Sequence, residues 1–265
     1  MIALLYHDVV PAGHFSSSGF RGHDADIYKF AVEQFTRHLD AIEAAVGPST
    51  VRLINDPDAL TQPNAVLFTF DDGGSGALVA ADLLEQRGWR GHFFITTDYI
   101  GKPEFLSRSD IRKLHARNHV IGSHSCSHPA RMSHCSRAQL LREWSDSTRK
   151  LSDICDATIR VASVPGGYFA PSVAEAAAAA GIATLFNSEP KAQPTSLHNC
   201  TVLGRYSIQQ GVSAETAANI ASGQWRPRAQ QLLFWNAKKL AKNIGGNYYI
   251  TVRKVLLNRE SSKAA

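Results

Sequence analysis

The sequence has no hydrophobic run long enough to cross a membrane, and it begins without the basic start, apolar core and cleavage site of a signal peptide. Cysteine is scarce, with four residues among 265, scattered without the paired spacing of a metal site. We therefore expect free thiols and a cytoplasmic protein. With 44% hydrophobic residues, the chain is excluded from the fibrous and disordered classes and has enough apolar side chains to fill one core.

Short apolar runs alternate with helical stretches along the chain, a pattern that predicts a parallel sheet. The expected strands are Ile2 to Tyr6, Val66 to Phe70, Gly91 to Ile95, Val120 to Ser123, Arg160 to Ser163, Ala183 to Phe186 and Thr201 to Arg205. The expected helices are Phe35 to Ala45, Ala77 to Arg87, Ser109 to Asn118, Arg137 to Asp153 and Pro171 to Ala180. Seven such units indicate an α/β fold, a distorted and incomplete (β/α)7 barrel.

Two adjacent carboxylates, Asp71 and Asp72, end the expected strand Val66 to Phe70 and precede Gly73, which permits a sharp turn. Because adjacent carboxylates repel each other, burying them is costly unless a cation or a proton offsets the charge. A metal site explains the pair, although a solvated Asp-Asp-Gly turn is the simpler alternative.

Two histidines four residues apart, His124 and His128, follow the expected strand Val120 to Ser123. Imidazole and carboxylate groups are the usual ligands of divalent transition metals, and a catalytic zinc site takes three protein ligands. The two histidines and one of the two aspartates would supply these three ligands, so the other aspartate would not be needed as a ligand. The combination therefore favours one bound divalent ion, Zn²⁺ by ligand type.

The run Thr69-Phe70-Asp71-Asp72-Gly73 followed by His124-Ser125 and His128 resembles the first two motifs of the polysaccharide deacetylase family (NodB homology domain, carbohydrate esterase family four). The opening Tyr6-His7-Asp8-Val9 is similar to the start of many members. The resemblance covers roughly residues 1 to 210. It implies that Asp71 is the general base and that Asp72, His124 and His128 bind the metal.

The third motif of the family, Arg-x-Pro-x-Gly, is similar to residues 163–167 only in part, because Ser163 replaces the arginine while Pro165 and Gly167 match. The resemblance implies that the Gly166 N–H helps to bind the oxyanion, which needs only a main-chain donor. The absent arginine pairs with the catalytic aspartate in relatives. We expect Arg205, at the end of the last strand, to supply that charge to Asp71 instead.

The family's Leu-x-His motif, whose histidine protonates the departing amine, is also absent, and the chain reads Val202-Leu203-Gly204-Arg205 there. Arginine does not release a proton near neutral pH, so another acid is needed. His7, at the end of the first strand, is the favoured candidate, and Glu189 is the second. A packed strand-end histidine is the alternative reading of His7.

Two loops fall outside the repeating pattern and are expected at the rim of the site. Residues 13–28 are rich in glycine, serine and histidine, and Phe20 and Tyr28 offer surfaces on which sugars stack. Residues 188–199, with two prolines, form the other loop. We predict substrate contacts from Phe20, Pro165 and Tyr168.

Residues 226–265 form a basic C-terminal extension to the catalytic barrel, residues 1–225. The extension holds nine Lys and Arg and one Glu, a formal charge of +8 against +5 for the whole chain, which leaves about −3 for the barrel. Apolar residues lie between the cations, a pattern typical of helices on an anionic membrane surface. Two helices that pack on the barrel with a solvated basic face are the alternative. No recognised motif indicates nucleic acid.

We predict a metal-dependent hydrolase that removes an N-acetyl group, or as a second choice an O-acetyl group, from a sugar or glycan precursor, as in exopolysaccharide biosynthesis. The resemblance alone implies the carbohydrate substrate and the metal-activated water. A cytoplasmic enzyme, at the inner membrane surface if the tail binds there, is expected to act on nucleotide- or lipid-linked sugars. Two alternatives stay open: a non-catalytic sugar-binding or regulatory barrel that retains the metal, and a hydrolase of a non-sugar amide.

Overall fold

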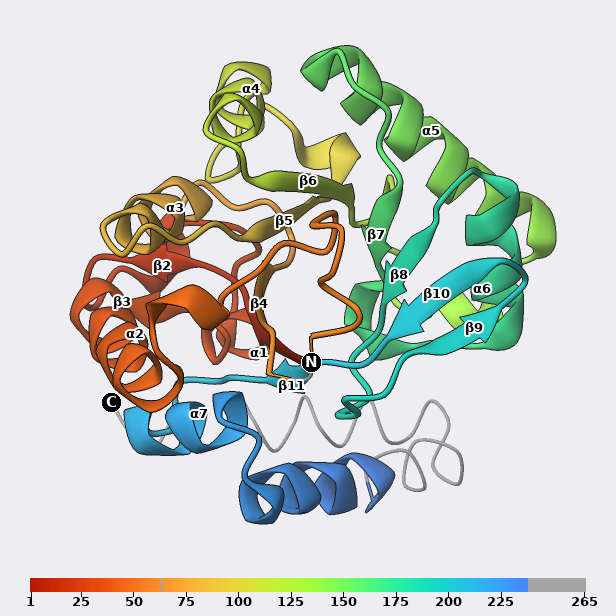
Figure 1. Ribbon diagram of the computed structural model, residues 1–265. Helices are drawn as coiled ribbons and strands as arrows, with labels where there is room; N and C mark the ends of the chain where they lie inside the picture. The colour runs from red at the N-terminus through yellow and green to blue at the C-terminus, as the bar shows by residue number, and fades with distance from the viewer. Residues whose placement is uncertain (63, 238–265) are drawn as a thin grey trace.

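A nine-stranded sheet, curled around a common centre, forms the body of the computed structural model, which describes residues 1–62 and 64–237 (Figure 1). The strand order is β11-β1-β4-β5-β6-β7-β8-β10-β9, and every neighbouring pair is parallel except β10 and β9. The strands are β1 (Ile2–Tyr6), β4 (Val66–Phe70), β5 (His92–Ile95), β6 (Val120–Ser123), β7 (Val161–Ser163), β8 (Thr184–Phe186), β9 (Thr195–Leu197), β10 (Cys200–Leu203) and β11 (Tyr206–Ser207). A separate parallel pair joins β2 (Val9–Val10) to β3 (Phe30–Ala31).

Helices cover the outside of the curled sheet (Figure 1). They are α1 (His23–Asp26), α2 (Val32–Val46), α3 (Ala77–Glu85), α4 (Arg108–Ala116), α5 (Arg137–Cys155), α6 (Pro171–Ala179) and α7 (Ala214–Ala221). Serine side chains cap the amino ends of α4 and α5: Ser107 and Ser136 each take part in a capping box, which satisfies backbone N–H groups that the first turn leaves free.

The predicted fold class is confirmed: the sheet is mostly parallel, incompletely closed and covered by helices. All seven predicted strands are present, with ends displaced by two residues at most, and all five predicted helices are present. The sequence patterns did not reveal α7, nor β9 inside the rim loop 188–199, which was expected to lack regular structure. β9 is mostly exposed and lacks the apolar run that marked the equally short strands β7 and β8.

The central strands are buried on both faces, as expected when helices cover a parallel sheet. All five residues of β1 and all five of β4 are buried. Gly122 in β6 is required by the packing, since a Cβ atom there would lie 2.5 Å from the ring of Phe94. These contacts fix the strand ends at the carboxyl side of the sheet, where the candidate site residues lie.

The last two barrel strands, β10 and β11, lie on opposite sides of the opening in the sheet and are joined by Gly204 and Arg205 alone. Gly204 packs so tightly against the rim loop that a Cβ atom there would lie 2.2 Å from the Glu189 carbonyl oxygen. We call this two-residue link the seam. It brings Arg205 into the centre of the barrel, where its side chain is fully buried.

The C-terminal extension is described only as far as residue 237, and residues 225–237 are helical. This helix packs on the barrel beside β11: Arg228 Nε donates to the Tyr206 hydroxyl at 2.8 Å, and Gln231 Nε2 donates to the Ser207 carbonyl at 2.9 Å. Residues 238–265, which hold most of the predicted basic tail, lie outside the described residues. In the described part of the chain, no helix combines the length and the apolar character needed to span a membrane.

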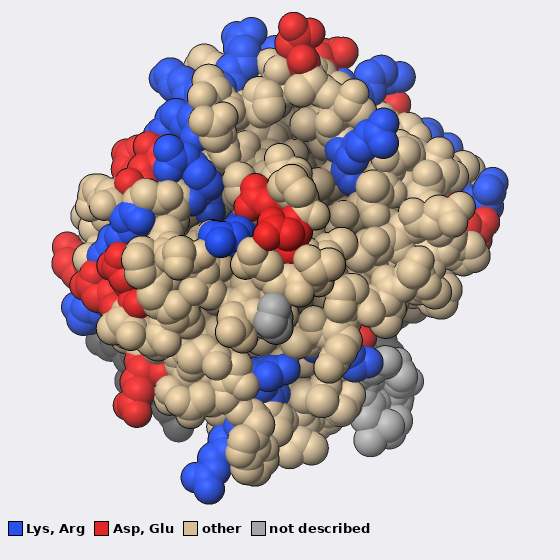
Figure 2. Space-filling view, in the orientation of Figure 1, with Lys and Arg blue, Asp and Glu red and all other residues tan. Residues whose placement is uncertain are grey.

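The face of the molecule in Figure 2 carries acidic and basic side chains interspersed along its edges, with an acidic group near the centre.

Candidate active site

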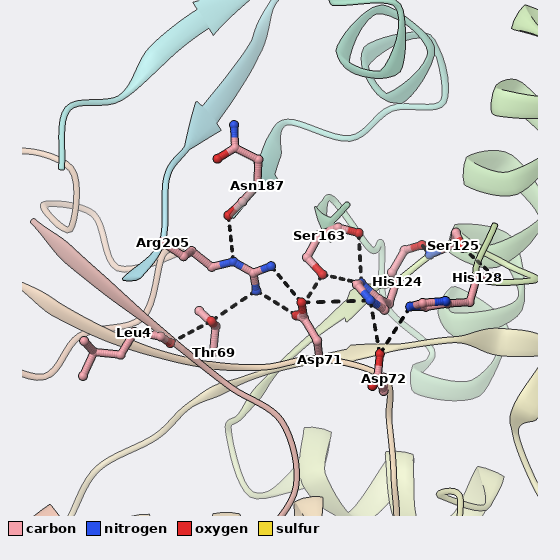
Figure 3. Close-up of polar contacts among 11 residues, drawn as sticks. Leu4, Thr69, Asp71, Asp72, His124, Ser125, His128, Ser163, Asn187 and Arg205 are labelled. Carbon is pink, nitrogen blue, oxygen red and sulfur yellow. Dashed lines mark hydrogen bonds and ion pairs between the residues drawn. The ribbon is translucent and has the colours of Figure 1, made fainter. Parts of the chain in front are cut away.

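Side chains from the carboxyl ends of several strands meet in one buried cluster (Figure 3). Asp71 and Asp72 follow β4, His124 follows β6, Ser163 ends β7, and Arg205 enters from the seam. Parallel strands place their carboxyl ends on one side of the sheet, so residues far apart in sequence converge there. The structure thus brings together the predicted base, the predicted metal ligands and Arg205.

The predicted ligands Asp72, His124 and His128 form a compact triad in which one ligand atom from each residue lies within 4.8 Å of the others. Asp72 Oδ1 is 3.4 Å from His124 Nε2 and 3.5 Å from His128 Nε2. This is the one such group of three or more His, Cys, Asp and Glu side chains in residues 1–62 and 64–237.

The backbone at this triad adopts conformations that non-glycine residues rarely take. The φ angles are 75° at Asp72, 65° at Ser125 and 57° at His128. Each left-handed residue costs about 1–2 kcal/mol relative to a right-handed one, and such strain clusters at functional sites. The Ser125 hydroxyl accepts a hydrogen bond from the His128 N–H at 3.1 Å, which stabilises the turn between the two histidines.

Ser163, the residue in place of the family arginine, connects the predicted base to a predicted ligand. Its hydroxyl donates to Asp71 Oδ1 at 2.9 Å, and His124 Nδ1 lies 2.5 Å from the same hydroxyl oxygen and 3.1 Å from the Ser163 carbonyl. A hydroxyl has one proton, which goes to Asp71, so Ser163 Oγ accepts from His124 and Nδ1 carries the imidazole proton. The Nε2 lone pair of His124 then faces Asp72.

Two acceptors, His124 Nε2 and Asp72 Oδ1, therefore face each other across 3.4 Å in a buried setting. Lone pairs in this arrangement repel unless a proton or a metal cation lies between them. A divalent metal ion fits this donor set, because two imidazoles and a carboxylate are typical zinc ligands and a second hydrogen bond from the ligand histidine is the usual support. The residues present fit the predicted ion, and its identity remains a prediction.

Asp71 and Arg205 form a fully buried, bidentate ion pair. Arg205 Nη1 donates to Asp71 Oδ1 at 2.7 Å, and Nη2 donates to Oδ2 at 2.8 Å. Arg205 Nε also donates to the carbonyl of Asn187, after β8, at 3.0 Å. Burial opposes ionisation of Asp71, but the charge and hydrogen bonds of Arg205, together with His124, outweigh it and lower the pKa of the carboxyl. Arg205 thus lies where the expected charge replacement requires it.

The two candidates for the general acid differ in their surroundings. His7 lies at the end of β1, stacked on Tyr28 with ring centroids 4.6 Å apart, and its buried Nδ1 has no hydrogen-bond partner among the described residues. Burial lowers the pKa of His7, and the charges of Asp72 and Asp71 oppose that effect. Glu189 instead pairs with Lys191 at 2.7 Å, away from the charges of Asp71 and Asp72 that act on His7. His7 is therefore better placed to reach a leaving group.

The turn after β7 carries the predicted oxyanion donor. Gly166 is exposed and left-handed, with φ 61°, and lies beside the ring of Tyr168. The half-buried Tyr168 is the more accessible of the two predicted substrate contacts here, because Pro165 is buried and starts the turn. Burial of Pro165 gives no support to a direct substrate contact by that residue.

Asp8 is a buried carboxyl beside the site that the sequence patterns did not single out. Its Oδ1 has no partner among the described residues, and Cβ atoms at Gly19 and Gly74 would lie 2.4 Å and 2.2 Å from its Oδ2. Burial, with the nearby charge of Asp72, raises the pKa of Asp8 to about 7. The backbone of the turn after Asp72 packs against this carboxyl at Gly74, so Asp8 helps to fix the position of that turn.

Comparison with known sequences agrees with the motifs. A family model described as Polysaccharide deacetylase matches residues 58–185, which include Asp71, Asp72, His124, His128 and Gly166 but neither His7 nor Arg205. A chitin deacetylase of Colletotrichum lindemuthianum is 33% identical over 95 residues, covering 34% of this chain and 38% of that protein. A chitooligosaccharide deacetylase of Sinorhizobium fredii is 27% identical over 133 residues, covering 49% of this chain and 59% of that protein.

Solved structures share the fold at low sequence identity. A polysaccharide deacetylase from Bacillus cereus superposes with a TM-score of 0.69 at 16% identity, covering 83% of this chain and 68% of that one. A de-N-acetylase from Aggregatibacter actinomycetemcomitans gives 0.68 at 16% identity, covering 83% and 98%. With the sequence matches, these comparisons confirm the resemblance to the polysaccharide deacetylase family.

We expect about one divalent ion per chain, bound through the triad. Elemental analysis of the purified protein should show it, and both Asp72→Ala and His124→Ala should lose it because each removes one of three ligands. His134→Ala is the matched control, since His134 is exposed and lies outside the triad. Wild-type affinity and stoichiometry in Asp72→Ala and His124→Ala would contradict the assignment.

Proposed function

We propose that this chain, whose residues 58–185 match the polysaccharide deacetylase family, is a metal-dependent hydrolase that removes N-acetyl groups from a sugar or glycan precursor. One observation carries the proposal: a buried carboxylate, ionised by a bidentate arginine, lies directly beside a three-residue metal triad. Hydrolysis of an amide needs a base near a Lewis acid, and this cluster supplies both.

The proposed reaction is the addition of water to the acetyl carbonyl, followed by loss of the sugar amine and release of acetate. A divalent ion bound by Asp72, His124 and His128 would supply Lewis-acid polarisation of the carbonyl and of the attacking water. Asp71 accepts a proton from that water. Arg205 keeps Asp71 ionised, and Ser163 with Arg205 orients its two oxygens, so the carboxylate is ready to act as the base.

The developing oxyanion and the leaving amine need two further groups. The Gly166 N–H, on the exposed left-handed turn after β7, is proposed to donate to the oxyanion. His7 is proposed to deliver the proton to the amine, which is supported by its buried Nδ1 without a protein partner. Asp71, which has just accepted a proton from the water, is proposed as the source of the proton that His7 delivers.

The decisive test is acetate release from a panel of substrates: N-acetylated monosaccharides, chitooligosaccharides, O-acetylated sugars, nucleotide- and lipid-linked glycans and simple non-sugar amides. We expect turnover of an N-acetylated carbohydrate by the wild type. Asp71→Asn, which keeps the shape of the base but removes its charge, should be inactive on the same substrate.

Each alternative predicts a different outcome on that panel. Turnover of O-acetylated sugars alone would show that the protein cleaves an ester bond and not an amide bond. Turnover of non-sugar amides alone would replace the carbohydrate substrate. Sugar binding in calorimetry without any acetate release would indicate a non-catalytic barrel and would overturn the proposed function.

The role of Arg205 generates a further prediction. Arg205→Ala should lower kcat/KM by about 10²–10⁴-fold, the range of general-base catalysis, while metal content stays normal. The same change raises the pKa of Asp71, so a larger fraction is protonated at a given pH. The acid limb of the pH–rate profile should therefore move to higher pH.

Loss of Arg205 also leaves a buried carboxylate unpaired, which typically costs about 3–5 kcal/mol of stability. Arg205→Lys keeps the positive charge but cannot donate to both oxygens of Asp71 in the bidentate geometry, so it separates the loss of charge from the loss of that geometry. Ser163→Arg in the Arg205→Ala background places the family arginine next to the volume that was emptied, and partial recovery of the rate is expected. An unchanged rate and pH profile in Arg205→Ala would contradict the proposal that Arg205 keeps Asp71 ionised.

A peripheral contact with anionic membranes is proposed for the C-terminal extension, and with it a location at a membrane surface. It is supported by helix 225–237, in which Trp225, Leu233 and Phe234 are 70%, 70% and 62% exposed. Leu60 is the other large exposed hydrophobic residue in residues 1–62 and 64–237. Apolar side chains next to a strongly basic segment are typical of binding to an anionic lipid surface.

Full-length protein is expected to co-sediment with vesicles of phosphatidylcholine and phosphatidylglycerol, and to be released at high salt because the attraction is screened. The double substitution Trp225→Ser and Leu233→Ser should weaken binding, while Leu60→Ser serves as the matched control. Equal sedimentation of all three proteins, or binding that ignores both lipid charge and salt, would contradict the proposal.

A further inference from the structure

The segment over residues 11–29 crosses the rim of the site and places one aromatic ring on each of two site histidines. The ring centroid of Phe20 lies 4.9 Å from that of His128, and the ring centroid of Tyr28 lies 4.6 Å from that of His7. These contacts link a segment without sequence periodicity to a predicted metal ligand and to the predicted acid.

Lys29 holds this segment from inside. Its side chain is buried, and its ammonium group donates to the carbonyls of Phe15 at 2.6 Å and Phe20 at 2.5 Å and to Asp26 Oδ1 at 3.0 Å. An ammonium group has three protons, and all three are used within the segment. A buried lysine is costly unless it is fully paired in this way, so its position is well determined by the fold.

The segment is also bound to the turn that follows Asp72. The Gly76 N–H donates to the Ser18 hydroxyl at 2.7 Å, and the Glu104 carbonyl accepts from both Gly19 N–H and Ser75 N–H. Gly19 has φ 63°, and a Cβ atom there would lie 2.4 Å from Asp8 Oδ2, so glycine is required at the point of closest approach. The position of Phe20, the next residue, is therefore determined by the turn that carries a metal ligand.

Phe20 is enclosed on its other sides by Tyr99 and Phe105, with centroids 4.8 Å and 5.1 Å away. Phe20 therefore packs within an aromatic cluster and is partly buried by it. His128, in turn, needs a support: His124 is anchored through Nδ1 to Ser163, whereas the His128 ring makes no hydrogen bond to another residue among the described ones apart from its approach to Asp72. The rotamer of His128 thus depends on what packs against the ring.

We propose that Phe20 is a positioning residue for His128 and that Lys29 maintains it, so that the 11–29 segment is a structural part of the metal centre. The inference rests on the proposed metal site but not on the proposed reaction. It assigns to Phe20 a role in metal affinity, in place of the substrate stacking that the sequence suggests. Hydrogen-bonded supports behind a ligand typically change metal affinity by about 10–100-fold, and we take this range as the expected effect of the packing contact.

The test is the affinity of full-length protein for Zn²⁺, measured by competition with a chromogenic chelator. Phe20→Ala and Lys29→Met should each weaken Zn²⁺ binding by about 10–100-fold. The double variant should bind Zn²⁺ almost as tightly as the single variant with the larger loss of affinity, because both changes act through the same contact. Phe15→Ala is the matched control, since it removes a ring from the same segment but keeps the carbonyl that Lys29 binds.

Wild-type Zn²⁺ affinity in Phe20→Ala would overturn the inference, and a raised KM with unchanged affinity would assign Phe20 to substrate stacking instead. If Lys29→Met does not fold, the Zn²⁺ affinity of Phe20→Ala is sufficient to test the inference. A protein that binds Zn²⁺ with the expected losses but releases no acetate would refute the proposed reaction and leave this inference standing. A wild type that binds no Zn²⁺ would overturn the metal site and this inference together.

Discussion

The buried pair between Asp71 and Arg205 links the seam after β10 to the end of β4, and the proposed chemistry of the site depends on it. Arg205 comes from the two-residue seam, and its guanidinium bonds to residues after β4 and after β8. Removing two charges from water costs several kcal/mol per ion, and only excellent geometry recovers it. The bidentate contact, with Nε bonded as well, meets that condition when Asp71 is ionised.

Ser163 shows how a lost side chain is replaced by two different contacts. The family arginine at this position would supply charge to Asp71, and here the charge comes from Arg205, which lies on the other side of Asp71 from Ser163 (Figure 3). The smaller serine leaves room for that guanidinium and adds a hydroxyl that bonds to Asp71 and His124 at once. The predicted base and a predicted metal ligand are therefore joined through one oxygen atom, which favours one tautomer of His124 and orients Asp71.

Much of this arrangement could be predicted from the sequence because its signals are local. Apolar runs predicted the strands, and the positions of Asp71, Asp72, His124 and His128 after those runs predicted that they would meet, since parallel strands end on one side of a sheet. Arg205 was expected at Asp71 for the same reason. Whether these residues perform their predicted roles stays a prediction.

The features that the sequence did not reveal depend on contacts between distant segments. The two hydrogen bonds of Ser163, the contact of the Asp8 carboxyl with the turn after Asp72, and the burial of Lys29 each require a partner that sequence spacing does not indicate.

The late position of Arg205 in the chain affects the order in which the site forms during synthesis. Asp71 and Arg205 are 134 residues apart, and domains form as the chain leaves the ribosome at about 5–20 residues per second. A nascent chain therefore contains Asp71 and the predicted metal ligands before Arg205 emerges, so the ion pair can form only after the strands from β1 to β10 have been synthesised.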